Sequence, residues 1–310
     1  MAIFEVEKDD LLRLSETQLE ELVARLAEAE VSSVGHSPAR VHWSGSITAP
    51  DEGIDIRVDV SPGEVNTGFL MRSNTIFQAK KHTMPASSIS GEMRPKGTLS
   101  PTISEQASNR GSYVIVSLDD DCSPPMKRDR LKAMREAVDD DPNNSNIHLD
   151  FYDRSKLHQW LRQYPSVVLW VRGVLGKALS GWQPYGRWSN PPTEADDNLI
   201  LAPGVSIIMP SETGGKLGIA DAIEPMRDLV RSTSKTIRVT GLSGVGKTRI
   251  VQALFDENIG ANALDRTIAI YVDTGASPDP SAHAMLERLI ADNRQAIMVL
   301  DNCPSDLHTA

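Results

Sequence analysis

The chain has 310 residues, of which 40% are hydrophobic and 24% are charged. This composition is that of a globular protein and excludes a disordered or fibrous chain, and the length favours about two domains. The formal net charge of −10 disfavours a protein that coats nucleic acid through bulk charge, because such proteins are basic. The only cysteines, Cys122 and Cys303, are too few for a disulfide scaffold or a multi-cysteine zinc site.

No segment of the sequence has the pattern of a membrane anchor. The most apolar stretch, residues 166–180, is interrupted by Arg172 and Lys177 and is shorter than the about 20 residues that a spanning helix needs. The N-terminus lacks the basic start and apolar core of a signal peptide. We therefore expect a soluble, cytoplasmic protein without a membrane partner.

The first part of the chain alternates predicted helices and strands. Apolar residues recur at helical spacing up to residue 29, and the main helix is expected over 16–29. Residues 53–60 alternate apolar and polar side chains, which predicts a strand. Further strands are expected at residues 75–80, 112–118 and 147–152. With helices at 126–138 and after the last strand, the order predicts a mixed α/β domain over residues 1–188.

A second domain is expected after a connector rich in proline, glycine and acidic residues at 189–217. In residues 218–310, predicted helices and strands alternate, which favours a parallel sheet between helical layers. The helices are expected at 221–231, 248–256 and 282–291, and the strands at 236–240, 267–273 and 296–300. Three strands are few for such a sheet, so we expect this chain to be the front of a longer protein.

The second domain contains a predicted phosphate-binding loop, because residues 241–248 fit the pattern GxxxxGK[ST]. Glycines let backbone N–H groups converge on phosphate oxygens, and the start of the following helix adds partial positive charge. A predicted strand precedes the loop and a predicted helix follows it, as the motif requires. The residues expected to bind ATP are Gly241, Ser243, Gly244, Val245, Gly246, Lys247 and Thr248.

The acid expected to accompany this loop is Asp301, which ends the hydrophobic strand at 296–300. Such an acid orients the nucleotide's Mg²⁺ together with the hydroxyl of Thr248. The next residue is Asn302, and a neutral amide is a poor general base for water. The sequence therefore predicts ATP binding with slow turnover.

Residue types suited to metal and phosphate chemistry fall on two strands of the first domain. Asp55 lies in the first strand, whereas Gln78 and Lys80 lie two apart in the second and so share a face. Pairing of the two strands would bring these groups together, with the carbonyl of Ala79 as a further ligand. Oxygen ligands suit Mg²⁺, and a neighbouring lysine can orient or deprotonate the attacking water and stabilise phosphorane charge.

This pattern resembles the Mrr-like branch of the PD-(D/E)xK nuclease superfamily. There, a helix bearing Phe-Glu or similar precedes a Gly-x-Asp strand and then Gln-x-Lys. The corresponding residues here are Leu19-Glu20, Gly53-Ile54-Asp55 and Gln78-Ala79-Lys80.

The resemblance implies a restriction-endonuclease-like fold, with Mg²⁺ or Mn²⁺ held by Asp55, Gln78 and Ala79. It makes Lys80 the catalytic lysine and Glu20 the helix glutamate, with Glu21 as the competing position. Because Gln78 replaces the usual acid, the site carries less negative charge and should bind metal more weakly. The same residues also fit an amphipathic hairpin with solvated aspartate and lysine side chains.

Two local excesses of basic residues interrupt the acidic chain. Residues 71–100 contain five basic side chains against one acid, and residues 126–136 contain five against two. Such patches are typical of contacts to a phosphate backbone. The second is equally typical of the solvated face of a surface helix.

The order of nuclease-like domain, linker and P-loop domain resembles the front of bacterial STAND NTPases of antiphage defence, such as the Avs type. That resemblance implies double-stranded DNA and ATP as ligands and a homo-oligomer on activation. It also implies a phage protein sensed by a region beyond this sequence. Two alternatives stay open: a restriction enzyme for modified or foreign DNA, and a nucleotide-switched scaffold whose nuclease fold is inactive.

Overall fold

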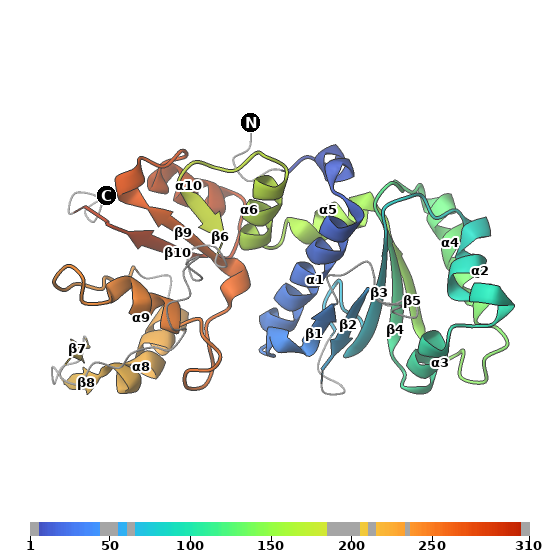
Figure 1. Ribbon diagram of the computed structural model, residues 1–310, viewed down its shortest axis with the longest axis horizontal. Coiled ribbons are helices and arrows are strands. Elements are labelled where there is room, and N and C mark those ends of the chain that lie inside the picture. Colours follow the sequence, from blue (N-terminus) through green and yellow to red (C-terminus); the bar gives the residue numbers. More distant parts are fainter. Residues whose placement is uncertain are drawn as a thin grey trace.

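The computed structural model describes residues 6–43, 55–60, 66–184, 205–209, 215–232 and 236–304. Its strands form a five-stranded sheet in the order β1-β2-β3-β4-β5, a three-stranded sheet in the order β10-β9-β6, and a β7–β8 pair (Figure 1). The expected α/β class, with a mixed sheet flanked by helices, is confirmed.

The elements fall into two groups along the chain. The first group is η1 (Lys8–Arg13), α1 (Glu16–Ser33), η2 (Pro38–Arg40), β1 (Val41–Trp43), β2 (Ile56–Asp59), β3 (Asn74–Lys80), α2 (Ala86–Met93), η3 (Pro95–Gly97), α3 (Pro101–Ser108), β4 (Ser112–Ser117), α4 (Pro124–Ala137), β5 (His148–Tyr152), α5 (Arg154–Leu161), α6 (Pro165–Val174) and β6 (Trp182–Pro184). The second is β7 (Ser206–Ile208), β8 (Lys216–Gly218), α8 (Ile219–Arg231), α9 (Lys247–Ala253), η4 (Arg266–Ile268), β9 (Ala269–Asp273), η5 (Thr274–Ala276), α10 (Ala282–Ala291) and β10 (Ile297–Asp301).

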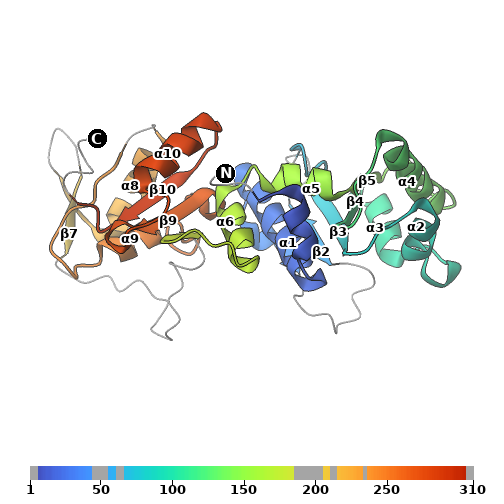
Figure 2. The same cartoon turned by 90° about the horizontal axis from the view of Figure 1, so that it is seen from above.

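The five-stranded sheet places several strand ends at one edge. Strand β2 runs antiparallel to β1 and β3, whereas β3, β4 and β5 are parallel. The start of β2 therefore lies beside the C-terminal end of β3. Helices α1 and α5 cover one face of the sheet, and α2, α3 and α4 cover the other (Figures 1 and 2).

Alternation along β3 decides which side chains face which layer. Phe77 and Ala79 belong to the apolar core formed with α1, whereas Ile76 belongs to the core formed with α2 and α4. Because successive side chains on a strand point to opposite faces, Gln78 and Lys80 lie on the face of α2.

The three-stranded sheet draws on both predicted domains. Strands β9 and β10 are parallel, and β6 pairs antiparallel with β9. Helix α6 lies between this sheet and α1 in both views (Figures 1 and 2). One continuous apolar core accordingly includes Val171 of α6, Ile270 of β9 and Met285 of α10, together with buried side chains of α1.

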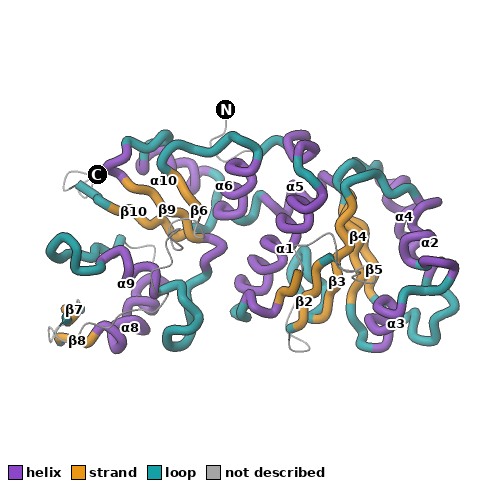
Figure 3. Tube along the Cα trace, in the orientation of Figure 1, coloured by secondary structure: helices purple, strands orange, loops and turns teal. Residues whose placement is uncertain are grey.

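The sequence mispredicts the segment before the P-loop. Residues 236–240 were expected to form a strand, but residues 236–246 form neither strand nor helix before α9 (Figure 3). Val239 still packs against the apolar core of α8 and α9, as does Val299 of β10. The segment thus has the apolar contacts of a core strand without backbone pairing to β10.

Several short elements were not predicted. Helices α2 and α3 have eight residues each and are rich in serine, so they lack an extended apolar periodicity. Most of the predicted connector at 189–217 lies outside the described residues, and part of its described remainder pairs as β7 with β8. Within the described ranges, no helix has the length and apolar character required to cross a membrane.

Candidate functional site

The sheet brings Asp55 and Gln78 into direct contact. The backbone N–H of Asp55 donates to the Phe77 carbonyl over 3.3 Å, which extends the β2–β3 ladder by one residue. Asp55 Oδ2 then accepts hydrogen bonds from Gln78 Nε2 at 3.1 Å and from the Ala79 amide at 2.6 Å. Gly53 and Ile54, the preceding residues of the Gly-x-Asp pattern, lie outside the described residues.

Lys80 lies on the same face of the sheet as Gln78 and forms an ion pair with Glu92. Its Nζ is 2.8 Å from Glu92 Oε1 on α2, and both side chains are largely buried. Burial raises the pKa of Asp55 to about 6, although the Ala79 hydrogen bond and the Lys80 charge lower it. Negative charge on Glu92 and Glu16 raises the pKa of Asp55 further. Two carboxylates and one ammonium therefore act electrostatically on Asp55.

Helix α1 adds negative charge to this environment. Glu16, at the first position of α1, is one of the charges that act on Asp55. Glu20 lies one turn later and is half-buried. Glu21 is paired with Arg25 over 2.7 Å, and Arg25 stacks on Trp170. Of the two glutamates near the site, Glu16 could have been suspected from its place at the helix start, whereas Glu92 lies on a helix that was not predicted.

The oxygen atoms at this site are of the type that a hard divalent cation prefers as ligands. Gln78 is 2% exposed, and its Oε1 has no hydrogen-bond partner in the part of the chain that the structure describes. Mg²⁺ binds carboxylate and amide oxygens, and its binding here would satisfy the amide oxygen that lacks a hydrogen bond. No cluster of three His, Cys, Asp or Glu side chains suited to a metal occurs among the described residues. Asp55 is thus the carboxylate of the set, with Gln78 and the Ala79 carbonyl as neutral donors.

Much of the basic charge counted in the sequence is neutralised by neighbours. Arg94 pairs with Asp140 over 2.6 Å in the first patch. Arg130 of α4, counted in the second patch, is buried against Asp120 and is not available to a phosphate backbone. Lys132 is exposed, as a solvated helix face predicts. The charge counts along the sequence therefore overstate the basic surface.

The glycine-rich loop at 241–246 has a backbone conformation that its glycines allow. Gly244 and Gly246 have φ of 79° and 89°, a region that side chains with a Cβ rarely enter. Helix α9 begins directly after, at Lys247, whose Nζ donates to the carbonyls of Gly241 at 3.1 Å and Leu242 at 2.8 Å. The predicted Ser243 and Val245 lie in this exposed loop.

Thr248 and Asp301 meet as the sequence predicts. Asp301 Oδ2, at the end of β10, accepts hydrogen bonds from Thr248 Oγ1 at 2.9 Å and from the Tyr271 hydroxyl at 3.0 Å. Asp273 is the register partner of Asp301 on β9 and accepts from Asn302 Nδ2 at 3.0 Å. A hydroxyl next to a carboxylate suits the Mg²⁺ of a nucleotide. Tyr271 and Asp273 were missed because their partners come from a neighbouring strand.

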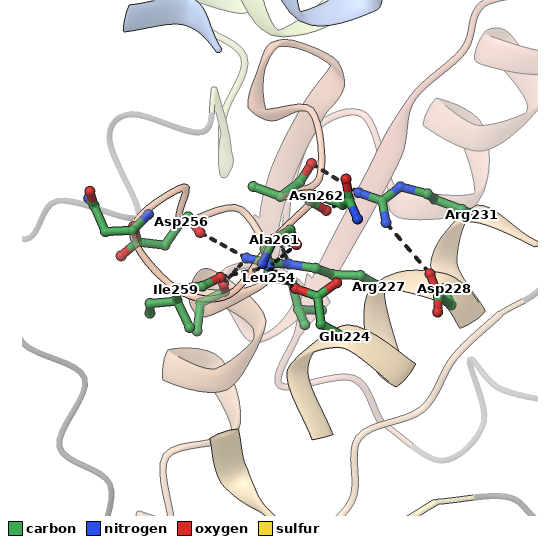
Figure 4. Close-up of polar contacts among 12 residues, drawn as sticks. Glu224, Arg227, Asp228, Arg231, Leu254, Asp256, Ile259, Ala261 and Asn262 are labelled. Atoms are coloured by element: carbon green, nitrogen blue, oxygen red, sulfur yellow. Dashed lines mark hydrogen bonds and ion pairs between the residues drawn. The ribbon is translucent and has the colours of Figure 1, made fainter. Parts of the chain in front are cut away.

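The far end of α9 is anchored by Arg227 of α8, whose side chain is fully buried (Figure 4). Its guanidinium pairs with Glu224 over 2.7 Å and donates to five carbonyl groups that end α9 and shape the following loop. The accepting carbonyls are those of Ala253, Leu254, Asp256, Ile259 and Ala261. Arg227 thus adds charged donors to the carbonyls at the end of α9, of which Ala253 and Leu254 also accept backbone N–H groups.

Comparison with known proteins gives no match: no family model, no curated protein and no solved structure resembles the chain.

The raised pKa of Asp55 predicts a pH-dependent stability. Between pH 4 and pH 6 the folded state holds the Asp55 proton more tightly than the unfolded state, so this group's contribution to stability falls as pH rises through that window. We expect Asp55→Asn to be more stable than the wild type at pH 7, with the difference shrinking toward pH 4. Urea unfolding across this range measures it.

Asp140→Asn is the control of opposite sign. Arg94 lowers the pKa of Asp140, so removal of this charge should destabilise the protein at pH 7 and matter less in acid. If the free energy of unfolding of Asp55→Asn changed with pH as that of Asp140→Asn does, Asp55 would not be held in a desolvating site.

Proposed function

We propose that this chain is a Mg²⁺-dependent endonuclease of double-stranded DNA. In this proposal an ATP-binding module of STAND type controls the enzyme by oligomerisation, and the protein serves bacterial antiphage defence. The observation that carries the proposal is the contact between the half-buried Asp55 carboxyl and the buried Gln78, with Lys80 on the same face. The amide oxygen of Gln78 has no hydrogen-bond partner among the described residues.

In the proposed nuclease site, three residues would bind the metal and one would provide a positive charge. Asp55, Gln78 and the Ala79 carbonyl would hold Mg²⁺ or Mn²⁺, which when bound lowers the pKa of water and offsets charge on the phosphate. Lys80 provides an ammonium that orients the attacking water and stabilises the negative charge of the phosphorane. With one carboxylate in the set, cation affinity should be modest, so cleavage should require millimolar metal.

The second half of the chain supplies the proposed control. Thr248 and Asp301 would share the Mg²⁺ of ATP, and Lys247 would reach its phosphates. A net charge of −10 gives one copy little affinity for DNA, which limits damage to the host. Clustering several copies on one duplex raises the effective concentration and hence the rate of cleavage.

The test is plasmid degradation with Mg²⁺ or Mn²⁺ and ATP, comparing the wild type with Lys247→Ala. We expect Lys247→Ala to lose ATP binding in calorimetry, because the ammonium that reaches the β- and γ-phosphates is gone. DNA cleavage that depends on ATP should be lost with it. Lys216→Ala, a lysine of the β7–β8 pair, is the control and should bind ATP as the wild type does. Full ATP binding by Lys247→Ala would contradict the proposed nucleotide site.

One observation favours a second function, a nucleotide-switched scaffold with an inactive nuclease fold. The donor set holds one carboxylate, and the described residues contain no group of three metal-ligating side chains. A wild-type chain that binds ATP and oligomerises but leaves plasmid DNA intact with either metal would decide for the scaffold.

A further inference from the structure

Glu92 is the acidic side chain that contacts the proposed catalytic lysine. Its Oε1 lies 2.8 Å from Lys80 Nζ, and the exposed fractions of the two side chains are 25% and 19%. Helix α2, which carries Glu92, is fixed against the sheet by the fully buried Ile89 and Met93. The pair is thus held by a packed helix and not by two mobile surface side chains.

The turn that leads from β3 to α2 is also held in place. The Met84 amide donates to Asp120 Oδ2 at 2.7 Å, and the Ser117 hydroxyl donates to the His82 carbonyl at 2.9 Å. Asp120 is itself buried and paired with Arg130. Since both ends of this connection are anchored, Glu92 has a defined position relative to the end of β3.

Lys80 has two carboxylates within electrostatic reach on this face of the sheet. It is bonded to Glu92, and it also acts on Asp55, whose Oδ2 is occupied by the Gln78 amide and the Ala79 N–H. An ammonium in a partly buried site pairs with a carboxylate wherever one is in reach, because an unpaired buried charge is costly. Without Glu92, Asp55 is a carboxylate in the described part of the chain with which Lys80 would pair.

We propose that Glu92 is a positioning residue, whose carboxylate holds the Lys80 ammonium on the α2 side so that this ammonium does not compete with a divalent cation for the Asp55 carboxylate. The inference rests on the proposed nuclease site. It adds that Glu92 keeps the Lys80 ammonium apart from the Asp55 carboxylate. Glu92 would act through Lys80 and would not itself bind the cation. It also provides, from a neighbouring helix, negative charge that Gln78 does not provide on the strand.

A double-mutant cycle on Mn²⁺ binding tests the proposal without requiring DNA cleavage. The full chain is titrated with Mn²⁺ without nucleotide, and Asp55→Asn defines the Asp55-dependent binding. We expect Glu92→Gln to weaken this binding by about tenfold, since Lys80 then pairs with Asp55. In a Lys80→Gln background the same Glu92→Gln change should cost less than about twofold, because the competing ammonium is absent.

Glu136→Gln is the control for bulk charge, because Glu136 on α4 forms an exposed pair with Lys132 over 3.6 Å. It should leave Mn²⁺ binding unchanged, and Glu92→Asp should restore part of what Glu92→Gln loses. An equal cost of Glu92→Gln in both backgrounds, no cost in either, or an equal effect of Glu136→Gln would overturn the inference alone. Absence of Asp55-dependent Mn²⁺ binding in the wild type would instead overturn the proposed nuclease site and the inference with it.

Discussion

Replacing Lys80 by alanine should abolish DNA cleavage while leaving the fold intact. Lys80 lies on the same face as Gln78 at the end of β3 and pairs with Glu92, and in the proposed site its ammonium would stabilise negative charge on the attacked phosphate. Loss of a charged group that stabilises developing negative charge costs about a hundredfold or more in rate. We expect Asp55→Ala to have an effect at least as large. Plasmid nicking at saturating Mn²⁺ measures both.

Lys132→Ala is the matched control, since Lys132 is an exposed lysine on α4 with a weak surface ion pair. It should cut as the wild type does. Circular dichroism and thermal unfolding of each variant separate a chemical loss from misfolding. Cleavage at the wild-type rate by both Lys80→Ala and Asp55→Ala would show that the nuclease site is wrongly assigned.

The largest loss of stability should follow replacement of Arg227 by methionine. The Arg227 side chain is fully buried, and its guanidinium serves five backbone carbonyls and Glu224 (Figure 4). Methionine fills much of the volume but removes the guanidinium donors from these carbonyls and the counter-charge from Glu224. Removing one partner of a buried network of this kind costs about 3–5 kcal/mol. Urea unfolding measures the loss.

Arg231 offers the control, because it lies one turn further along α8 and also donates to loop carbonyls, at Asn262 and Ala263. Its side chain is exposed, so Arg231→Met should cost at most about 1 kcal/mol. Should Arg227→Met prove too unstable to purify, Arg227→Lys keeps the charge but loses the planar fork and is expected to fall between the two. Equal stability of Arg227→Met and Arg231→Met would rule out a structural role for the buried network.

The parts of the fold that the sequence predicts well are those with a strong local pattern. Strands β3, β4 and β10 and helix α10 follow apolar periodicities that can be read within ten residues. The segment at 236–240 shows the limit, because its apolar residues predict a strand but cannot say whether a neighbouring strand pairs with it. Short serine-rich helices such as α2 carry too little periodicity to be predicted.

The residues of the candidate site also differ in whether a local sequence pattern predicts them. Asp55, Gln78 and Lys80 could be predicted because strand alternation fixes which side chains share a face. Glu92 and Tyr271 could not, since each contacts the site from an element whose position depends on tertiary packing. The buried state of Arg130 was also unpredictable, because its partner Asp120 precedes the helix and folds back onto it.

The pairing of β6 with β9 has a consequence for how the chain can be divided. Residues 182–184 belong by sequence to the first predicted domain, yet they complete the sheet of the second, and α6 packs between the two. A nick in the chain between residues 185 and 204 would therefore leave two fragments that stay bound through apolar contact. Because side chains of α1, α6, β9 and α10 share one apolar core, we expect the two halves to unfold together.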